Sequence, residues 1–312
     1  MNPHEYCSQK AAPPGSSLYY ALRQTPSSQR DALSALLAFR QELVSTVLAV
    51  SDPSVAQAKL AWWQRETQQA QLKPPVHPVL IALAQSLPVG FTLSPSAPMQ
   101  NESLGTNAPH PDKHLPPDLI TALLAMVASY EADLMQARYL DFPGLTHYLT
   151  STDGAFTTLL CRVSMILGQV MPNLSTKQSD TWSERLGIAL GLARIVADVG
   201  ENARQGRIYL PISEMQRFGV TAADILNRRY SDAFSSLMAF QTTRARSELK
   251  SALAAMPHTG RTIRAALKLP RAQVAIALRL LDEIESSQFQ VLHQRIALTP
   301  LRNAWSAWRG AR

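Results

Sequence analysis

The chain is poor in the residues that mark disulfide scaffolds, glycine-rich phosphate-binding folds and membrane spans. It has two cysteines, Cys7 and Cys161, far apart and without metal-ligand spacing, which favours a reducing compartment over a disulfide framework. Glycine is scarce at 13 residues, and no glycine-rich phosphate loop occurs. No apolar run approaches the ~20 residues of a membrane span, and residues 1–10 lack the apolar core of a signal peptide. We therefore expect a cytoplasmic protein, with contact at a membrane surface left open.

Charged residues are also sparse, and the basic ones outnumber the acidic ones. They make up 17% of the chain against 46% hydrophobic residues, a composition that folds rather than staying disordered. The formal net charge of +7 suits anionic partners such as diphosphates or acidic lipids, although an ordinary basic surface explains it equally well. Because the basic residues are dispersed and no nucleic-acid-binding motif occurs, nucleic acid is not an expected partner.

Apolar residues recur at helical spacing along most of the chain, and no segment alternates as a β-strand would. Proline stands at the expected start of several helices, as in Asp52-Pro53, where it is favourable. The helical pattern stops between Pro88 and Pro117, and this segment (88–117) predicts a long flexible surface loop. We predict an all-α chain that forms one domain over residues 1–312. The main expected helices cover residues 31–50, 54–71, 78–87, 117–139, 145–167, 181–203, 228–256, 258–268 and 270–294.

Three polar residues near the end of one expected helix form the most site-like group. Asp198, Glu201 and Asn202 lie at positions i, i+3 and i+4, so they share one helix face. Oxygen ligands spaced in this way can hold Mg²⁺, which prefers one or two carboxylates together with substrate phosphate oxygens. Arg207 and Tyr209 follow, and the arginine can bind a phosphate through paired hydrogen bonds. Taken alone, the commoner explanation of such a group is a solvated helix end.

Two further segments carry polar residues of interest. The hydroxyls of Ser16, Ser17 and Tyr20 can reach a diphosphate, but such residues can equally cap the first helix. Glu131 and Asp133 do not share a helix face, so they are not a metal-binding pair. We expect Asp133 to pair with a cation on another helix.

Together these segments resemble the squalene/phytoene synthase family, in particular its bacterial presqualene diphosphate synthase branch, which serves hopanoid synthesis. The resemblance spans about residues 3–309, apart from the loop at 88–117. The matching pieces are Gly15-Ser16-Ser17-Leu18-Tyr19-Tyr20, Asp52-Pro53 with Ala58-Lys59-Leu60-Ala61-Trp62-Trp63, Glu131-Ala132-Asp133 with Arg138-Tyr139, Asp198 through Pro211, Leu281-Asp282-Glu283-Ile284, and Leu298-Thr299-Pro300-Leu301-Arg302.

The resemblance implies an all-α isoprenoid-synthase bundle around a central apolar cavity. In the family, two aspartate-rich helices face each other at the cavity mouth and bind Mg²⁺, which grips the diphosphates of two prenyl chains that join head to head. Several carboxylates are needed because the metal ions must offset the charge of the leaving diphosphate. On this chain the resemblance implies Asp198, Glu201 and Asn202 as metal ligands. It implies substrate binding by Ser16, Ser17, Tyr20, Arg194, Arg207 and Tyr209.

This chain departs from the family pattern at both aspartate motifs. Where family members carry Arg-Glu-x-Asp-Asp-x-x-Asp, it has Gln41-Glu42-Leu43-Val44-Ser45-Thr46-Val47-Leu48. Val44 and Leu48 are one helical turn apart, so this face has become apolar. In the second motif the closing aspartate is Asn202, which contributes no charge. Arg194 stands where the family has asparagine, and its charge favours binding an anion without ionising it.

Two functional hypotheses follow. In the first, the protein keeps a cavity for a prenyl diphosphate or other isoprenoid lipid, has lost or weakened Mg²⁺-dependent prenyl transfer, and acts as a binding or assembly protein with a protein partner. In the alternative, it is an active transferase that condenses two farnesyl diphosphates to presqualene diphosphate or squalene, with an altered metal site. A family resemblance alone does not decide between them.

Overall fold

The computed structural model describes residues 1–48, 52–93, 114–136, 138–170, 176–257 and 260–312, with the backbone alone for 176–179. These residues form helices and no strand, which confirms the all-α prediction. None of the described helices is both long and apolar enough to cross a membrane. The elements are α1 (Pro3–Ala11), α2 (Ser17–Arg23), α3 (Ser27–Leu48), α4 (Pro53–Gln69), α5 (Pro78–Ser86), α6 (Pro117–Leu134), α7 (Phe142–Leu149), the π-helical turn η1 (Thr150–Gly154), α8 (Ala155–Leu167), α9 (Thr176–Ala197), α10 (Val199–Arg204), α11 (Ile212–Arg217), α12 (Ala222–Leu226), α13 (Asp232–Ala255), α14 (Arg261–Ala266), α15 (Lys268–Ser286) and α16 (Pro300–Ala311).

Local sequence signals explain where several helices begin. Asp52 caps α4 by accepting a hydrogen bond from the Ser54 backbone N–H at 2.8 Å, and Pro53 occupies the first helical position. Thr299 caps α16 in the same way, again directly before a proline. Pro270, in contrast, lies within the first turn of α15, which begins at Lys268 and ends at Ser286 rather than near residue 294.

Two expected long helices are interrupted. The one predicted over 145–167 consists of α7, the π-helical turn η1 and α8, and the one predicted over 181–203 divides at Asp198 into α9 and α10. Asp198 has φ −103° and ψ 15°, outside the helical region. The three candidate ligands Asp198, Glu201 and Asn202 are therefore not on one regular helix face.

Of the loop expected at 88–117, residues 94–113 lie outside the described chain. Some of the described residues on either side are packed into the core, whereas residues 88–90 are exposed. Phe91, Leu93 and Leu115 are buried, and the Leu115 N–H donates to the Ala70 carbonyl at 3.0 Å. Three apolar side chains at the margins of the expected loop thus enter the core, and its flexibility stays a prediction.

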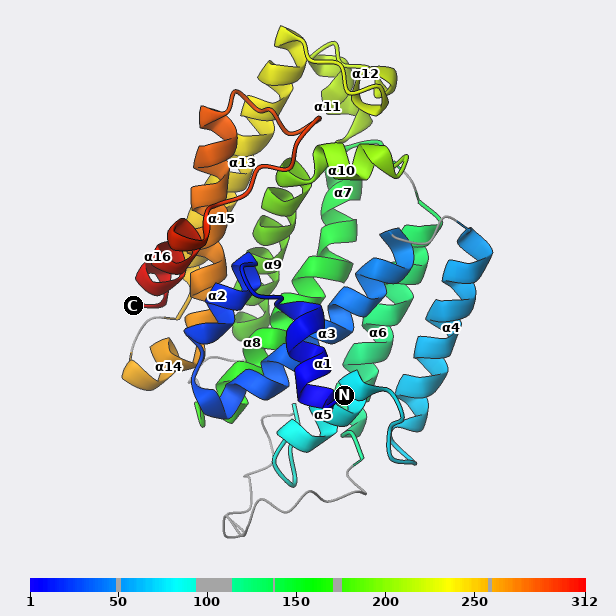
Figure 1. Ribbon diagram of the computed structural model, residues 1–312, viewed down its shortest axis with the longest axis vertical. Coiled ribbons are helices and arrows are strands. Elements are labelled where there is room, and N and C mark those ends of the chain that lie inside the picture. The colour runs from blue at the N-terminus through cyan, green and yellow to red at the C-terminus, as the bar shows by residue number, and fades with distance from the viewer. Residues whose placement is uncertain (49–51, 94–113, 137, 171–175, 258–259) are drawn as a thin grey trace.

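The bundle has two buried cores on either side of a central pair of helices. Figure 1 shows α4 and α6 on one side and α13, α15 and α16 on the other, with α8 and α9 between them. The N-terminal core gathers around α3, and the second core gathers around α9 and α13. Leu280 on α15 packs against both. This places α3, η1, α9 and α15 around the middle of the molecule.

The close approach of α9 to η1 depends on glycine. A Cβ atom at Gly187 would lie 2.2 Å from the backbone oxygen of Asp153, and one at Gly191 would lie 2.9 Å from the Asp153 Cγ. Real Cβ atoms do not come so near to backbone atoms, so only residues without a side chain allow this contact. As a result, the Asp153 side chain lies directly against α9.

Candidate functional site

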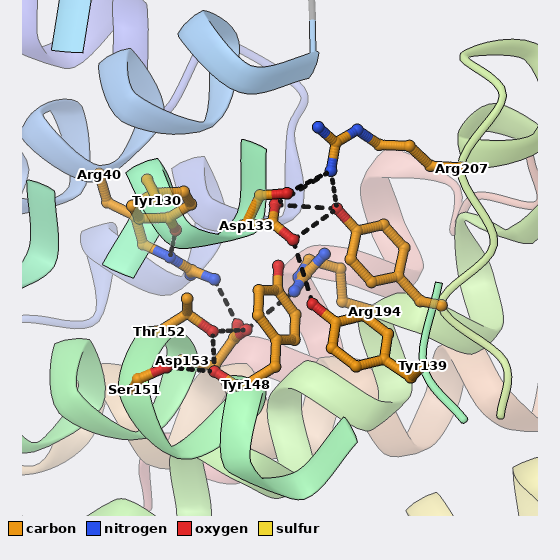
Figure 2. A network of polar contacts seen from close by, with 11 residues as sticks. Arg40, Tyr130, Asp133, Tyr139, Tyr148, Ser151, Thr152, Asp153, Arg194 and Arg207 are labelled. Atoms are coloured by element: carbon orange, nitrogen blue, oxygen red, sulfur yellow. Dashed lines mark hydrogen bonds and ion pairs between the residues drawn. The ribbon is translucent and has the colours of Figure 1, made fainter. Parts of the chain in front are cut away.

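A buried polar network occupies the centre of the bundle, and its first half is built on Asp153 (Figure 2). Asp153, 3% exposed, lies on η1 and accepts hydrogen bonds from Arg194 of α9 at 2.8 Å and from Arg40 of α3. Arg40 also donates from Nε to the Tyr130 hydroxyl at 3.3 Å. Burial alone would raise the pKa of Asp153, but the charges and hydrogen bonds of Arg194 and Arg40 together outweigh it and hold that pKa below its ordinary value.

The second half of the network is built on Asp133, at the end of α6. The Tyr139 and Tyr209 hydroxyls donate to its carboxylate at 3.2 and 3.1 Å, and the Arg207 guanidinium lies 3.4 Å away. The rings of Tyr139, Tyr148 and Tyr209 stand against one another, with centroids 5.2 to 5.9 Å apart. Burial raises the pKa of Asp133 despite Arg207, and burial beside Asp133 raises the pKa of Tyr209 to about 12. The cation expected for Asp133 is thus Arg207, which lies after α10 rather than on a helix.

A cavity of about 270 Å³ adjoins this network between α2, α9 and α15; we call it the Arg194 cavity. Its apolar walls come mainly from leucine and isoleucine, and its polar atoms come from two arginines, an aspartate, a serine and a glutamine. The lining residues are Ser17, Leu18, Leu190, Ala193, Arg194, Ala197, Asp198, Gln273, Ile276, Ala277, Leu280, Arg295 and Ile296. The cavity is therefore amphipathic, and the charged residues of its lining are two arginines and one aspartate.

The structure brings only some of the candidate substrate-binding residues together. Ser17 and Arg194 line the Arg194 cavity, whereas Arg207 and Tyr209 belong to the Asp133 network. Ser16 caps α2 by accepting from the Tyr19 N–H at 3.2 Å. Tyr20 is half-buried, with its ring edge-on to Tyr19, and is not among the residues that line the cavity.

The three candidate metal ligands are separated by their own partners. Asp198 lies 3.5 Å from Arg295, and burial raises its pKa although Arg295 and Arg194 are near. Glu201, with 47% of its side chain exposed, pairs with Arg204 at 2.7 Å on the surface. Asn202 is buried, and its side-chain nitrogen has no hydrogen-bond partner among the residues that the structure describes. These side chains thus point to different surroundings rather than to a common ion.

Comparison with known proteins identifies the fold and the family. The sequence model of the squalene/phytoene synthase family matches residues 11–97 and 108–302. The chain belongs to this family. The phytoene synthase of Arthrospira platensis is 28% identical over 304 residues, covering 94% of this chain and 87% of that protein. A 15-cis-phytoene synthase of Synechocystis sp. is 33% identical over 180 residues, covering 54% of this chain and 51% of that protein.

Two solved structures share the fold of this squalene/phytoene synthase family member. A dehydrosqualene synthase in complex with ligand superposes with a TM-score of 0.73 at 18% identity, covering 99% of this chain and 95% of that one. The squalene synthase HpnC from Alicyclobacillus acidocaldarius superposes with a TM-score of 0.66 at 16% identity, covering 92% and 94%. The predicted isoprenoid-synthase bundle is therefore confirmed.

The family implies Mg²⁺, and the side chains present do not fit it. On α3, Val44 and Leu48 pack against the N-terminal core, and the Ser45 hydroxyl donates to a backbone carbonyl of its own helix at 2.7 Å. The Glu42 carboxylate faces α1, where it accepts from the Tyr6 hydroxyl at 2.5 Å and pairs with Lys10 at 3.1 Å. Throughout the part of the chain that the structure describes, no three His, Cys, Asp or Glu side chains gather closely enough to hold a metal ion.

Sequence reasoning missed Arg40 and Asp153, the two residues at the centre of this family member's network. A signal was available in the helical periodicity. Arg40 has Leu36, Leu43 and Val47 at positions −4, +3 and +7, and Asp153 has Leu149, Phe156 and Leu160 at the same positions. Each is thus a charged residue on an apolar helix stripe. Because a buried charge requires a partner, two such residues of opposite sign predict a buried ion pair.

Proposed function

We propose that this squalene/phytoene synthase family member binds a single isoprenoid in the Arg194 cavity and does not carry out Mg²⁺-dependent head-to-head condensation. It then acts through binding, as a carrier or an assembly protein. One observation carries the proposal: each acidic residue that remains of the two aspartate motifs has its own partner. Glu42 pairs with Lys10, Asp198 pairs with Arg295, and Glu201 pairs with Arg204.

The direction of these carboxylates supports a loss of metal-assisted chemistry. Glu42 and Ser45 line a cavity between α1, α3 and α4, whereas Asp198 lines the Arg194 cavity. Metal-assisted departure of a diphosphate needs several carboxylates around the same ions. The apolar side chains of Val44 and Leu48 supply none, and a small shift of α3 would not bring a carboxylate to Asp198.

The size of the Arg194 cavity supports one ligand rather than two. Its volume is about 270 Å³. That volume lies at the lower end of the about 300–1,000 Å³ of small-molecule pockets, so the cavity can take the head group and first units of one chain but cannot enclose two. One isoprenoid with its head group beside Arg194 and Ser17 and its first units against Leu190, Ile276 and Leu280 suits these walls.

The condensation assay tests the catalytic half of the proposal. Purified protein is incubated with farnesyl or geranylgeranyl diphosphate and Mg²⁺, and products are extracted and analysed by mass spectrometry. We expect neither a cyclopropyl diphosphate nor a condensed hydrocarbon above the level without protein. Turnover at the rate of an ordinary synthase would refute the proposal and establish the alternative, an active transferase. The alternative is favoured by the phytoene synthases among the relatives.

A pair of substitutions on one helix tests the binding half. Leu280 and Leu278 are both half-buried on α15, but Leu280 lines the Arg194 cavity and Leu278 lines a separate groove beside α16. Leu280→Trp should fill the cavity and abolish the thermal stabilisation given by farnesyl ligands, whereas Leu278→Trp should leave it intact. Equal effects of the two substitutions, or no stabilisation of the wild type by any isoprenoid, would count against binding at this cavity.

A further inference from the structure

Two arginines from different helices converge on one carboxylate of the same chain. Arg40 on α3 and Arg194 on α9 both direct their guanidinium groups at Asp153 on η1 (Figure 2). Arg40 binds Oδ1 and Arg194 binds Oδ2, the latter at 2.8 Å, so that both oxygens are engaged. Paired guanidinium groups in this arrangement are the usual means of holding a carboxylate or phosphate. The site is therefore an anion-binding site whose anion is part of the protein.

The surroundings of Asp153 fix its carboxylate in that position. It lies on a π-helical turn, an element that often marks functional positions. Gly187 and Gly191 bring α9 against this turn, and a Cβ atom at Gly191 would lie 3.0 Å from the Asp153 Oδ2. The Thr152 hydroxyl lies 3.4 Å from the same oxygen. The carboxylate thus has little freedom to move away from the two arginines.

The charged side chains around the Arg194 cavity are paired within the chain itself. Arg194 is paired with Asp153 and Arg295 with Asp198, and Arg40 leaves a single positive charge in excess. Arg194 keeps 31% of its side chain exposed, toward the cavity that it lines. Asp153 is 3% exposed and is not among the residues that line the cavity, so an incoming diphosphate would meet Asp198 at the wall and would find the Arg194 guanidinium already paired with Asp153. A ligand with an uncharged head group meets neither obstacle.

We propose that Asp153 is an internal counter-ion that fills the anion position between Arg40 and Arg194, so that the cavity takes isoprenoids with an uncharged head group, such as prenyl alcohols, in preference to prenyl diphosphates. The choice of an isoprenoid rests on the proposed function. The filled anion position does not, because it follows from the contacts of Asp153 alone.

Inorganic diphosphate tests the anion position without any isoprenoid. Its binding to the wild type, Asp153→Asn and Asp153→Glu is measured by titration calorimetry. Asp153→Asn frees both guanidinium groups, and we expect diphosphate to bind it about tenfold more tightly than the wild type, or better. Asp153→Glu keeps the negative charge and should bind as weakly as the wild type. Equal affinity of the wild type and Asp153→Asn would overturn the proposal.

The double variant Arg40→Gln/Asp153→Asn separates charge from other effects of the substitution. Summed over residues 40, 153 and 194, it has the same net charge as the wild type. It should therefore lose most of the gain in diphosphate affinity that Asp153→Asn shows. If Asp153→Asn does not fold alone, diphosphate must restore its cooperative thermal unfolding, since the added anion replaces the missing carboxylate. A failure to restore it would overturn the proposal.

Farnesol and farnesyl diphosphate, which differ only in the head group, test the ligand class. The wild type should prefer farnesol, and Asp153→Asn should shift the ratio of the two affinities toward the diphosphate by about tenfold. An unchanged ratio would overturn the counter-ion proposal while leaving isoprenoid binding established. Conversely, if neither isoprenoid binds but Asp153→Asn gains diphosphate affinity, the counter-ion stands and the proposed function fails.

Discussion

Asp153→Asn should destabilise the fold by an amount that the geometry allows us to bound. The substitution keeps the shape of a side chain that is 3% exposed, but removes the only negative charge that contacts both Arg40 and Arg194 among the described residues. Breaking a buried ion pair by removing one partner costs about 3–5 kcal/mol. Because Arg194 keeps 31% of its side chain exposed and Arg40 21%, some hydration remains, and we expect the lower value, about 3 kcal/mol.

Urea unfolding followed by circular dichroism measures this loss, and the melting temperature should fall by about 6 °C or more. A loss of this size lies within the usual stability of about 5–15 kcal/mol, so the variant should still fold. Asp282→Asn is the matched control: Asp282 also contacts two arginines, Arg246 at 3.2 Å and Arg279 at 3.8 Å, but has 51% of its side chain exposed. Its substitution should cost less than about 1 kcal/mol.

A double-mutant cycle assigns the loss to the unpaired charges. Arg194→Gln added to Asp153→Asn removes one of the two uncompensated guanidinium groups. The double variant should therefore be more stable than the sum of the single effects predicts, by about 1 kcal/mol or more. Additive effects, or an Asp153→Asn variant within about 0.5 kcal/mol of the wild type, would refute the assignment of Asp153 as a buried counter-ion.

Three further predictions follow from other contacts. Gly187→Ala places a Cβ atom 2.2 Å from the Asp153 backbone oxygen, so it should cost about 2 kcal/mol or more in urea unfolding; a change below about 0.5 kcal/mol would contradict the close packing of α9 on η1. Burial raises the pKa of Asp133, so the folded protein binds a proton on this carboxylate more tightly than the unfolded chain does. The wild type should therefore lose stability relative to Asp133→Asn as pH rises from about 4 through the raised pKa. A difference in unfolding free energy between the two proteins that does not change with pH would contradict this. Cys7 and Cys161 are fully buried, and burial raises the pKa of Cys7 to about 12 and that of Cys161 further still. Mass spectrometry should therefore find both thiols unmodified by iodoacetamide at pH 8 in the native protein and modified in urea.

Local sequence determined much of the helical framework. Asp52-Pro53 begins α4 as predicted, because a capping side chain and a proline act within a single turn. Thr299-Pro300 begins α16 by the same means, although no helix was predicted there. The same local signals did not predict the breaks at η1 and at Asp198. Those breaks depend on what packs against the helix: a Cβ atom at Gly200, just after the second break, would lie 2.2 Å from the backbone oxygen of Val291.

The sequence by itself also determined that Val44 and Leu48 offer no carboxylate on their face of α3, since neither side chain can act as one in any fold. It did not determine the role of Arg194. Read along the chain, this arginine is a free charge that favours an external anion, whereas in the structure it is bound to Asp153, 41 residues away. Pairing between distant charges depends on which helices approach closely, and here the glycines of α9 allow α9 to lie against η1. Only the tertiary structure therefore decided that the anion beside Arg194 belongs to the protein itself.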